Sequence, residues 1–382
     1  MLVAWVIAGA AAVQQPVTVD YAGDAQALDR IIVQNYAYED HWPGGVLPDS
    51  PALAAERAAV HDGKSLLHYA EHRIASLADH HAITGSSFKD SWAVVPTYSD
   101  MWIERRGRDY VITSVRDGSP AQSAGIRPDD RLAAVEGLPT AQAVEAFWRE
   151  LGLSLTDERA DYAARVLAAG RRDRPRNLTI GSANGTRSIK LPNLYGKAAD
   201  RPPLSVTRTA SGTIIRFNNS LGDQSTIAAF DAAMGALSRK VPLTVDLRDT
   251  PSGGNTSVAR AIMGWFVDRP RSYQMHRLPS EERETGVPRQ WIEQVLPRSG
   301  KHHAVLPLVQ VGRWTGSMGE GLAIGFAALG ARVEGTPMAQ LKGAVYDFNL
   351  PSSGLTVKLP AERLYTVDGL PREKFIPKPM RN

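Results

Sequence analysis

The stretch from residue 306 to residue 342 constrains the fold most, because it joins a short apolar run, a group of small residues and a helical pattern. Leu306 to Val311 is typical of a buried strand. From Gly319 to Leu329, apolar residues recur at helical spacing despite three glycines. Ser317 therefore stands where a strand turns into a helix, whose first N–H groups point toward its hydroxyl. This arrangement suits a nucleophile whose attack on a carbonyl creates an oxyanion.

A serine nucleophile needs a base, and the nearest downstream candidate is a lysine. Lys342 follows Ser317 by 25 residues, and Arg332 to Gly335 is predicted to form a strand that returns the chain toward the serine. Burial among apolar neighbours such as Met338 lowers the pKa of a lysine, so that its neutral amine can accept a proton. Ser–Lys pairs are a known variant of the catalytic triad. We predict that Lys342 takes the proton of Ser317.

A glycine-containing turn is the second informative motif. The apolar strand that starts at Pro242 ends in Asp246-Leu-Arg-Asp-Thr-Pro-Ser-Gly-Gly-Asn. Glycines allow the backbone to approach a reacting carbonyl and to aim N–H groups at it. An ordinary strand-to-helix turn is the alternative interpretation. We expect Asp246 and Arg248 to form a structural ion pair rather than to act in catalysis.

These two motifs together resemble those of the C-terminal processing peptidases, also called tail-specific proteases. Thr-Gly-Ser-Met-Gly-Glu at 315–320 and Lys-Gly-Ala-Val from Lys342 are similar to the family's Ser-x-x-Glu and Lys-Gly segments. The segment after Pro242 is similar to the family's Asp-Leu-Arg-x-Asn-x-Gly-Gly, with one extra residue here. The resemblance implies that Ser317 is the nucleophile and Lys342 the base of a serine peptidase.

The resemblance also implies an oxyanion hole and a partner for the lysine. The hole would consist of the N–H of Met318 and that of either Gly253 or Gly254. The extra residue leaves the choice between the two glycines open. The family often has a glutamine four residues after the lysine, thought to orient it. Tyr346 stands at that position here, and its hydroxyl is able to bond the amine instead.

The rest of the chain fits a multidomain α/β organisation. Gly118-Ser-Pro-Ala and the residues after it resemble a PDZ domain, whose strand edge binds a chain end. Its carboxylate-binding loop would lie near Asp100 to Ile103, where the usual glycines are absent. Substrate binding and simple scaffolding both remain open for it. The expected parts are a signal segment at 1–20, a helical N-terminal region at 21–97, a PDZ-like domain at 98–193 with a helical insertion at 152–174, a linker at 194–211 and a crotonase-like α/β core at 212–382.

Composition excludes several classes of protein. The 382 residues are 43% hydrophobic, enough for a sizeable core, and contain no cysteine for disulfides or thiolate metal sites. The net charge of +4 is spread along the chain, and no nucleic-acid motif is found. Met1 to Val13 is apolar and ends in small residues, which favours export to the periplasm or the medium. It lacks a positive start and is too short to span a bilayer, so a cytoplasmic location also remains open.

Histidines gather in the N-terminal region. His68 and His72 lie four residues apart, as metal ligands on one helix face would. Because no third ligand stands at a known spacing, we expect surface or capping roles and neither metal nor cofactor. Asp79-His80-His81 falls where the peptidase family often has a Leu-x-Asp-x-His segment, and we assign it no chemical role.

The sequence thus predicts a serine endopeptidase that acts on polypeptides through an acyl-enzyme, including substrates held by their C-terminus at the PDZ-like groove. A Ser–His site that uses His276, His302 or His303 is the competing mechanism. These histidines fall in Val267 to His303, which we expect to form a lid or rim over the site. A catalytically weak binding or scaffold protein is the main alternative function. A hydrolase of small esters or amides is the third.

Overall fold

The protein begins with a helical layer. The computed structural model describes residues 18–196 and 201–380. Side chains of Asp20, Ser50 and Asp62 cap the first three α-helices by accepting backbone N–H bonds, as N-cap residues do. These helices are α1 (Tyr21–Asn35), α2 (Pro51–Ala58) and α3 (Gly63–Ala75), with short 3₁₀ turns at η1 (Glu39–His41) and η2 (Pro43–Gly45).

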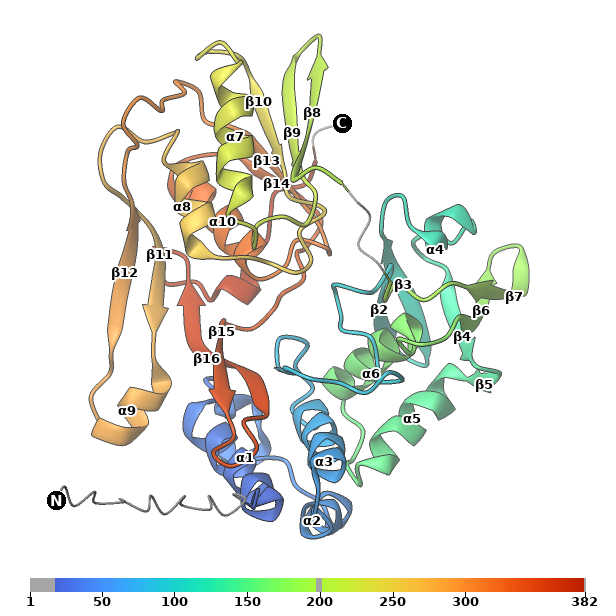
Figure 1. The fold of residues 1–382 in the computed structure, drawn as a ribbon. Helices are drawn as coiled ribbons and strands as arrows, with labels where there is room; N and C mark the ends of the chain where they lie inside the picture. Colours follow the sequence, from blue (N-terminus) through green and yellow to red (C-terminus); the bar gives the residue numbers. More distant parts are fainter. Residues whose placement is uncertain (1–17, 197–200, 381–382) are drawn as a thin grey trace, which may run out of the picture.

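A six-stranded antiparallel sheet follows and lies to the right in Figure 1. Its strand order is β2-β3-β4-β6-β7, and β5 pairs with β4. Helix α6 falls inside the segment 152–174 and packs beside β2. The elements are β2 (Met101–Arg106), β3 (Asp109–Val115), α4 (Pro120–Ser123), β4 (Arg131–Val135), β5 (Leu138–Pro139), α5 (Thr140–Glu150), α6 (Asp157–Ala169), β6 (Arg176–Ser182) and β7 (Gly185–Leu191).

A mostly parallel sheet with helices packed on it forms the next layer. Its order is β14-β13-β10-β9-β8, in which only β8 runs antiparallel to its neighbour. Parallel strands place their carboxyl ends at one edge, so the loops after β10 and β13 meet there. The elements are β8 (Leu204–Thr209), β9 (Gly212–Phe217), α7 (Ser225–Gly235), β10 (Leu243–Asp246), α8 (Thr256–Met263), β13 (Leu308–Val311), α10 (Met318–Ala328) and β14 (Val333–Gly335).

A third sheet joins the parallel layer to the N-terminal helices. The long strand β16 pairs with β1 near its start, with β15 over residues 356–362 and with β11 near its end. Residues 350–359 of this hairpin pack against α1 and α3 in one apolar cluster, and Figure 1 shows the hairpin reaching α1. The elements are β1 (Ile83–Thr84), β11 (Arg271–Arg277), α9 (Pro279–Thr285), β12 (Gln290–Val295), β15 (Ala344–Asn349), β16 (Thr356–Tyr365) and η3 (Arg372–Lys374).

The predicted mixed α/β fold is confirmed, but one segment differs from the sequence interpretation. The expected linker at 194–211 contains β8, which pairs with β9 along its whole length. Five of the six β8 residues are exposed, so this edge strand lacks the alternation that identifies a half-buried strand. The expected lid or rim at 267–303 contains β11, α9 and β12. Strand β11 pairs with β16 inside a sheet, and Gln274, His276, Trp291 and Glu293 line the same cavity as Ser317, as expected of a rim.

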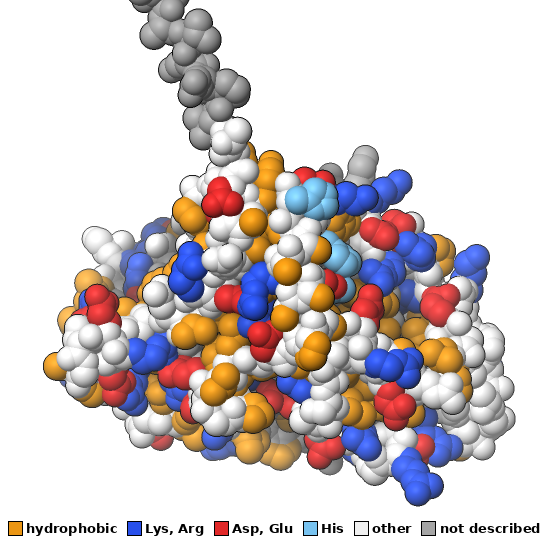
Figure 2. All heavy atoms as spheres, turned by 90° about the horizontal axis from the view of Figure 1, so that it is seen from below, with side chains coloured by type: hydrophobic (Ala, Val, Ile, Leu, Met, Phe, Trp, Pro, Cys, Tyr) orange, Lys and Arg blue, Asp and Glu red, His pale blue; other side chains and the backbone are white. Residues whose placement is uncertain are grey.

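The surface and the chain start add little to the functional question. Residues 1–17 of the expected signal segment at 1–20 lie outside the described residues. Within residues 18–196 and 201–380, no helix is long and apolar enough to cross a membrane. Figure 2 shows acidic and basic side chains interspersed over the face seen from below, which fits the small net charge.

Candidate active site

Ser317 lies at a strained turn between β13 and α10. Its backbone angles are φ 51° and ψ −114°, a left-handed conformation that is rare outside glycine. Strain of this kind is characteristic of a serine that a strand-to-helix turn presents to substrate. A bridge between Thr250 and Thr315 joins the loops that follow β10 and β13. The predicted strand, turn and helix around Ser317 are therefore confirmed.

The hydrogen-bond partner of the Ser317 hydroxyl is a histidine. His81 Nε2 lies 3.0 Å from Ser317 Oγ, and His81 Nδ1 lies 2.6 Å from the Lys342 carbonyl oxygen. A carbonyl can only accept a hydrogen bond, so Nδ1 carries the proton and donates it. Nε2 is then the acceptor for the serine O–H. This is the geometry of a nucleophile and its general base, with the base oriented by a third group.

The electrostatics of His81 keep it neutral. Burial, and next the charge of Arg372, lower the pKa of His81 to about 4. At neutral pH the imidazole is therefore unprotonated and able to accept the serine proton. Asp79 lies next to it and accepts the backbone N–H of His81 at 2.9 Å. Its negative charge favours the imidazolium that would form during a reaction.

The Lys342 side chain departs from its predicted place. Its Nζ donates to Glu158 of α6 at 3.0 Å, whereas the side chain bonded to the Ser317 hydroxyl at 3.0 Å is that of His81. Burial by itself would lower the pKa of Lys342, but the charges of Asp79 and Glu158 outweigh it and raise the pKa. The amine is therefore a cation, the opposite of the neutral base that was predicted. Glu158 precedes Lys342 by 184 residues, so no local sequence pattern predicts this ion pair.

A buried glutamate fixes the segment that carries Lys342. Glu320 is fully buried and accepts the backbone N–H groups of Ser317 at 2.9 Å, Gln340 at 2.8 Å and Leu341 at 3.2 Å. Burial raises its pKa to about 7. Glu320 thereby joins the serine turn to residues 340 and 341. The next residue, Lys342, has the carbonyl that orients His81.

The predicted oxyanion donors lie beside the serine and differ in availability. A Cβ at Gly253 would be 2.9 Å from Ser317 Oγ and 3.1 Å from the Met318 nitrogen, so this glycine touches the nucleophile. The Gly253 N–H already donates to the Thr250 carbonyl at 3.1 Å. Among the described residues, the N–H groups of Gly254 and Met318 have no hydrogen-bond acceptor. These two are free to hold an oxyanion.

Tyr346 and His276 belong to a separate cluster in the same cavity. The Tyr346 hydroxyl donates to Glu362 at 2.6 Å rather than to Lys342, so the tyrosine does not orient the lysine here. His276 Nδ1 bonds the same Glu362. The cavity measures about 780 Å³ and is lined by these three side chains together with Ser317 and His81.

The other predicted features are placed as follows. Asp246 and Arg248 form the expected ion pair, with two contacts of 2.9 Å. His303 Nε2 bonds the Val241 carbonyl at 3.0 Å, away from the serine. The histidine beside the serine, to which the sequence interpretation assigned no role, is His81. Its only signal was its place in the family's Leu-x-Asp-x-His segment.

Helix α6 covers the free edge of β2. The Arg105 N–H donates to Asp161 at 2.7 Å, and the Ile103 carbonyl accepts from Arg165 at 2.9 Å. Backbone groups that are already bonded in this way cannot pair with another chain. In the region expected to bind a carboxylate, Asp100 is buried and paired with Arg176 at 2.6 Å.

Solved structures provide the comparison with known proteins. No protein-family model and no curated protein sequence matches the chain. The photosystem II D1 C-terminal processing protease superposes with a TM-score of 0.56 at 16% identity, over 95% of this chain and 94% of its own. Mature CPAF gives 0.57 at 14% identity, over 94% and 92%. The chain therefore has the fold of the C-terminal processing peptidases, the family that its serine and Asp-Leu-Arg motifs resemble.

Proposed function

We propose that this protein is a serine peptidase in which Ser317 is the nucleophile and His81 is its general base. The single observation that carries the proposal is the 3.0 Å hydrogen bond between Ser317 Oγ and His81 Nε2 at the start of α10. Peptidase chemistry, rather than another acyl transfer, is favoured by the likeness over nearly the whole chain to a processing protease.

The reaction follows from the groups at the site. The Ser317 proton passes to His81 Nε2 as Oγ bonds the carbonyl carbon of the substrate. The N–H groups of Met318 and Gly254 hold the resulting oxyanion, and each donor is worth about 2.7–4 kcal/mol. The imidazolium returns its proton to the leaving amine, so that the peptide C–N bond breaks and an acyl-enzyme remains. Water, deprotonated by His81, releases the acyl group.

In this proposal Lys342 contributes its backbone rather than its amine. Its carbonyl fixes the tautomer and direction of His81, while its ammonium is bound to Glu158. A Ser–Lys mechanism would require the amine to leave Glu158 and lose its proton.

The test of function is cleavage of an unstructured protein such as casein, followed on gels. We expect cleavage by the wild type and none by Ser317→Ala. No cleavage by either protein, with both folded, would refute the peptidase proposal and favour the scaffold alternative. Turnover of small esters without cleavage of casein would favour the small-molecule hydrolase.

We further infer that the PDZ-like region does not capture a chain end while α6 is in place, because Asp161 and Arg165 occupy the backbone groups of β2. The test is binding of a fluorescent apolar peptide with a free C-terminal carboxylate, measured by anisotropy. The wild type should not bind it, and the amidated peptide is the control. Carboxylate-dependent binding by the wild type would contradict this inference.

A further inference from the structure

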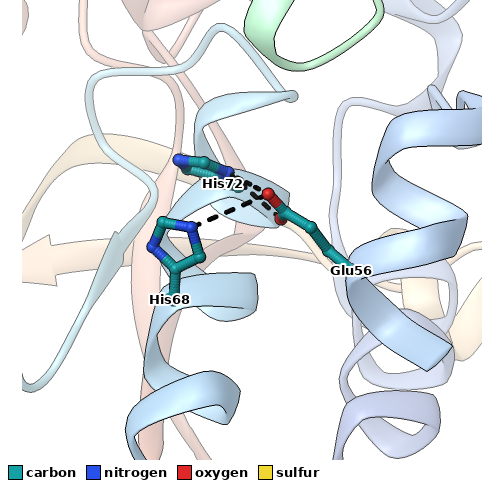
Figure 3. A group of neighbouring side chains, drawn as sticks. All are labelled: Glu56, His68 and His72. Carbon is teal, nitrogen blue, oxygen red and sulfur yellow. Dashed lines mark hydrogen bonds and ion pairs between the residues drawn. The ribbon is translucent and has the colours of Figure 1, made fainter. Parts of the chain in front are cut away.

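Two neighbouring helices bring three metal-ligating side chains together, far along the chain from Ser317. His68 and His72 lie one turn apart on α3, and Glu56 reaches them from α2 (Figure 3). Their nearest ligand atoms all lie within 4.8 Å of one another. We propose that Glu56, His68 and His72 form a binding site for a divalent transition metal of the zinc class.

The distances suit a metal with little rearrangement. His72 Nδ1 lies 2.8 Å and His68 Nε2 lies 3.7 Å from the same carboxylate oxygen, Glu56 Oε1. Two ligands bound to tetrahedral zinc at about 2.1 Å stand about 3.4 Å apart. To bring the ligand atoms from their present separations to about 3.4 Å, each side chain has to shift by well under 1 Å.

The donor set specifies the class of metal. Two imidazoles and one carboxylate make up the three protein ligands of a common zinc site, which keeps a fourth position for water. The side chains are 54%, 19% and 28% exposed for His68, His72 and Glu56, so solvent reaches that position. A cavity of about 250 Å³, lined by both histidines, lies beside them.

The surroundings favour a cation and explain the proton balance. The carboxylates of Glu71 and Glu150 line the same cavity, so that together with Glu56 three acidic side chains surround the two imidazoles. Zinc would replace the hydrogen bond between His72 Nδ1 and Glu56, and the proton of that bond would be released when the metal binds. No oxidant or further reactant is needed.

The sequence around the site also contains a metalloprotease pattern. His68-Tyr-Ala-Glu-His72 has the H-x-x-E-H spacing, in which the glutamate serves as a base for metal-bound water. Here Glu71 accepts a bond from Ser91 Oγ at 2.5 Å and lies outside the group of converging ligands. We therefore assign the site to joining α2 and α3 rather than to a second hydrolytic reaction. The ligand missed from the sequence, Glu56, comes from another helix.

The experiment is titration of the metal-free full-length chain with zinc chloride by calorimetry, and with cobalt chloride by visible absorption. We expect one zinc ion per chain, a tetrahedral cobalt spectrum, and a higher melting temperature with zinc. His72→Ala and His68→Ala should each weaken zinc binding about tenfold or more. Even the loss of a residue that only hydrogen-bonds to a metal ligand lowers metal affinity about 10–100-fold. The control, His61→Ala, removes an exposed histidine outside the group and should change nothing.

Several outcomes would overturn the assignment. These are no uptake of zinc by the wild type, uptake that survives in His68→Ala/His72→Ala, and equal weakening by His61→Ala. Because the His68 side chain is the most exposed of the three, His68→Ala keeps the test meaningful if His72→Ala fails to fold. Ser317→Ala should bind zinc like the wild type, so failure of this proposal and failure of the peptidase proposal are distinguishable.

Discussion

Replacing Glu320 with alanine should destabilise the protein strongly, because one buried carboxylate serves three backbone donors. The N–H groups of Ser317, Gln340 and Leu341 lie 2.8–3.2 Å from its oxygens. A buried donor without an acceptor costs about 1–3 kcal/mol, so three cost roughly 3–9 kcal/mol. Burial disfavours the charge of Glu320 and raises its pKa to about 7, so removing it returns part of that loss. We expect a net loss of about 3–5 kcal/mol, a large share of the roughly 5–15 kcal/mol that stabilises a folded protein.

Urea unfolding followed by tryptophan fluorescence measures this loss. Glu320→Gln keeps one acceptor oxygen and should fall between the wild type and Glu320→Ala. The control is Glu145→Ala, which alters an exposed glutamate on α5 and should stay within about 0.5 kcal/mol of the wild type. If Glu320→Ala unfolds at the same urea concentration as this control, the carboxylate does not hold the serine turn to the 340–341 loop.

Three further predictions concern the active site. Gly253→Ala should lower kcat by about 10²–10³-fold, because the added Cβ would lie 2.4 Å from the Cβ of Ser317 at a φ of 67°; an active variant would contradict the close approach. Tyr346→Phe should change kcat/KM less than about threefold, since its hydroxyl bonds Glu362 rather than the lysine; a hundredfold loss would refute this. Because the pKa of His81 is lowered to about 4, kcat/KM should be level around neutrality and fall only as the pH drops toward that value; a rise with a pKa near that of lysine would count against a histidine base.

The sequence predicted the parts of the site that depend on local pattern. A short apolar run followed by small residues and a helical repeat identified the turn at Ser317. The glycine pair was placed beside it correctly, since a Cβ on Gly253 would touch the serine. The turn at Ser317 is local because it depends on residues within one strand–turn–helix unit, whereas the place of the glycine pair was implied by the family resemblance.

The partner of the serine could not be predicted in this way. The pairs His81–Ser317 and Glu158–Lys342 join residues 236 and 184 positions apart. The choice between the two bases depends on α6, because its Glu158 binds Lys342 as a cation and so prevents it from acting as a base. This helix lies in a segment that was interpreted only as an insertion. Similarly, β8 has an exposed edge pattern, and its strand character depends on pairing with β9.

The most direct test of the account compares kcat/KM for His81→Ala and Lys342→Met on one peptide substrate. If His81 takes the proton of Ser317, His81→Ala should lose about 10²–10⁴-fold, whereas Lys342→Met, which keeps the backbone carbonyl, should lose less than about tenfold. The reverse order, with the lysine variant inactive and the histidine variant nearly as active as the wild type, would contradict the assignment of His81 as the base.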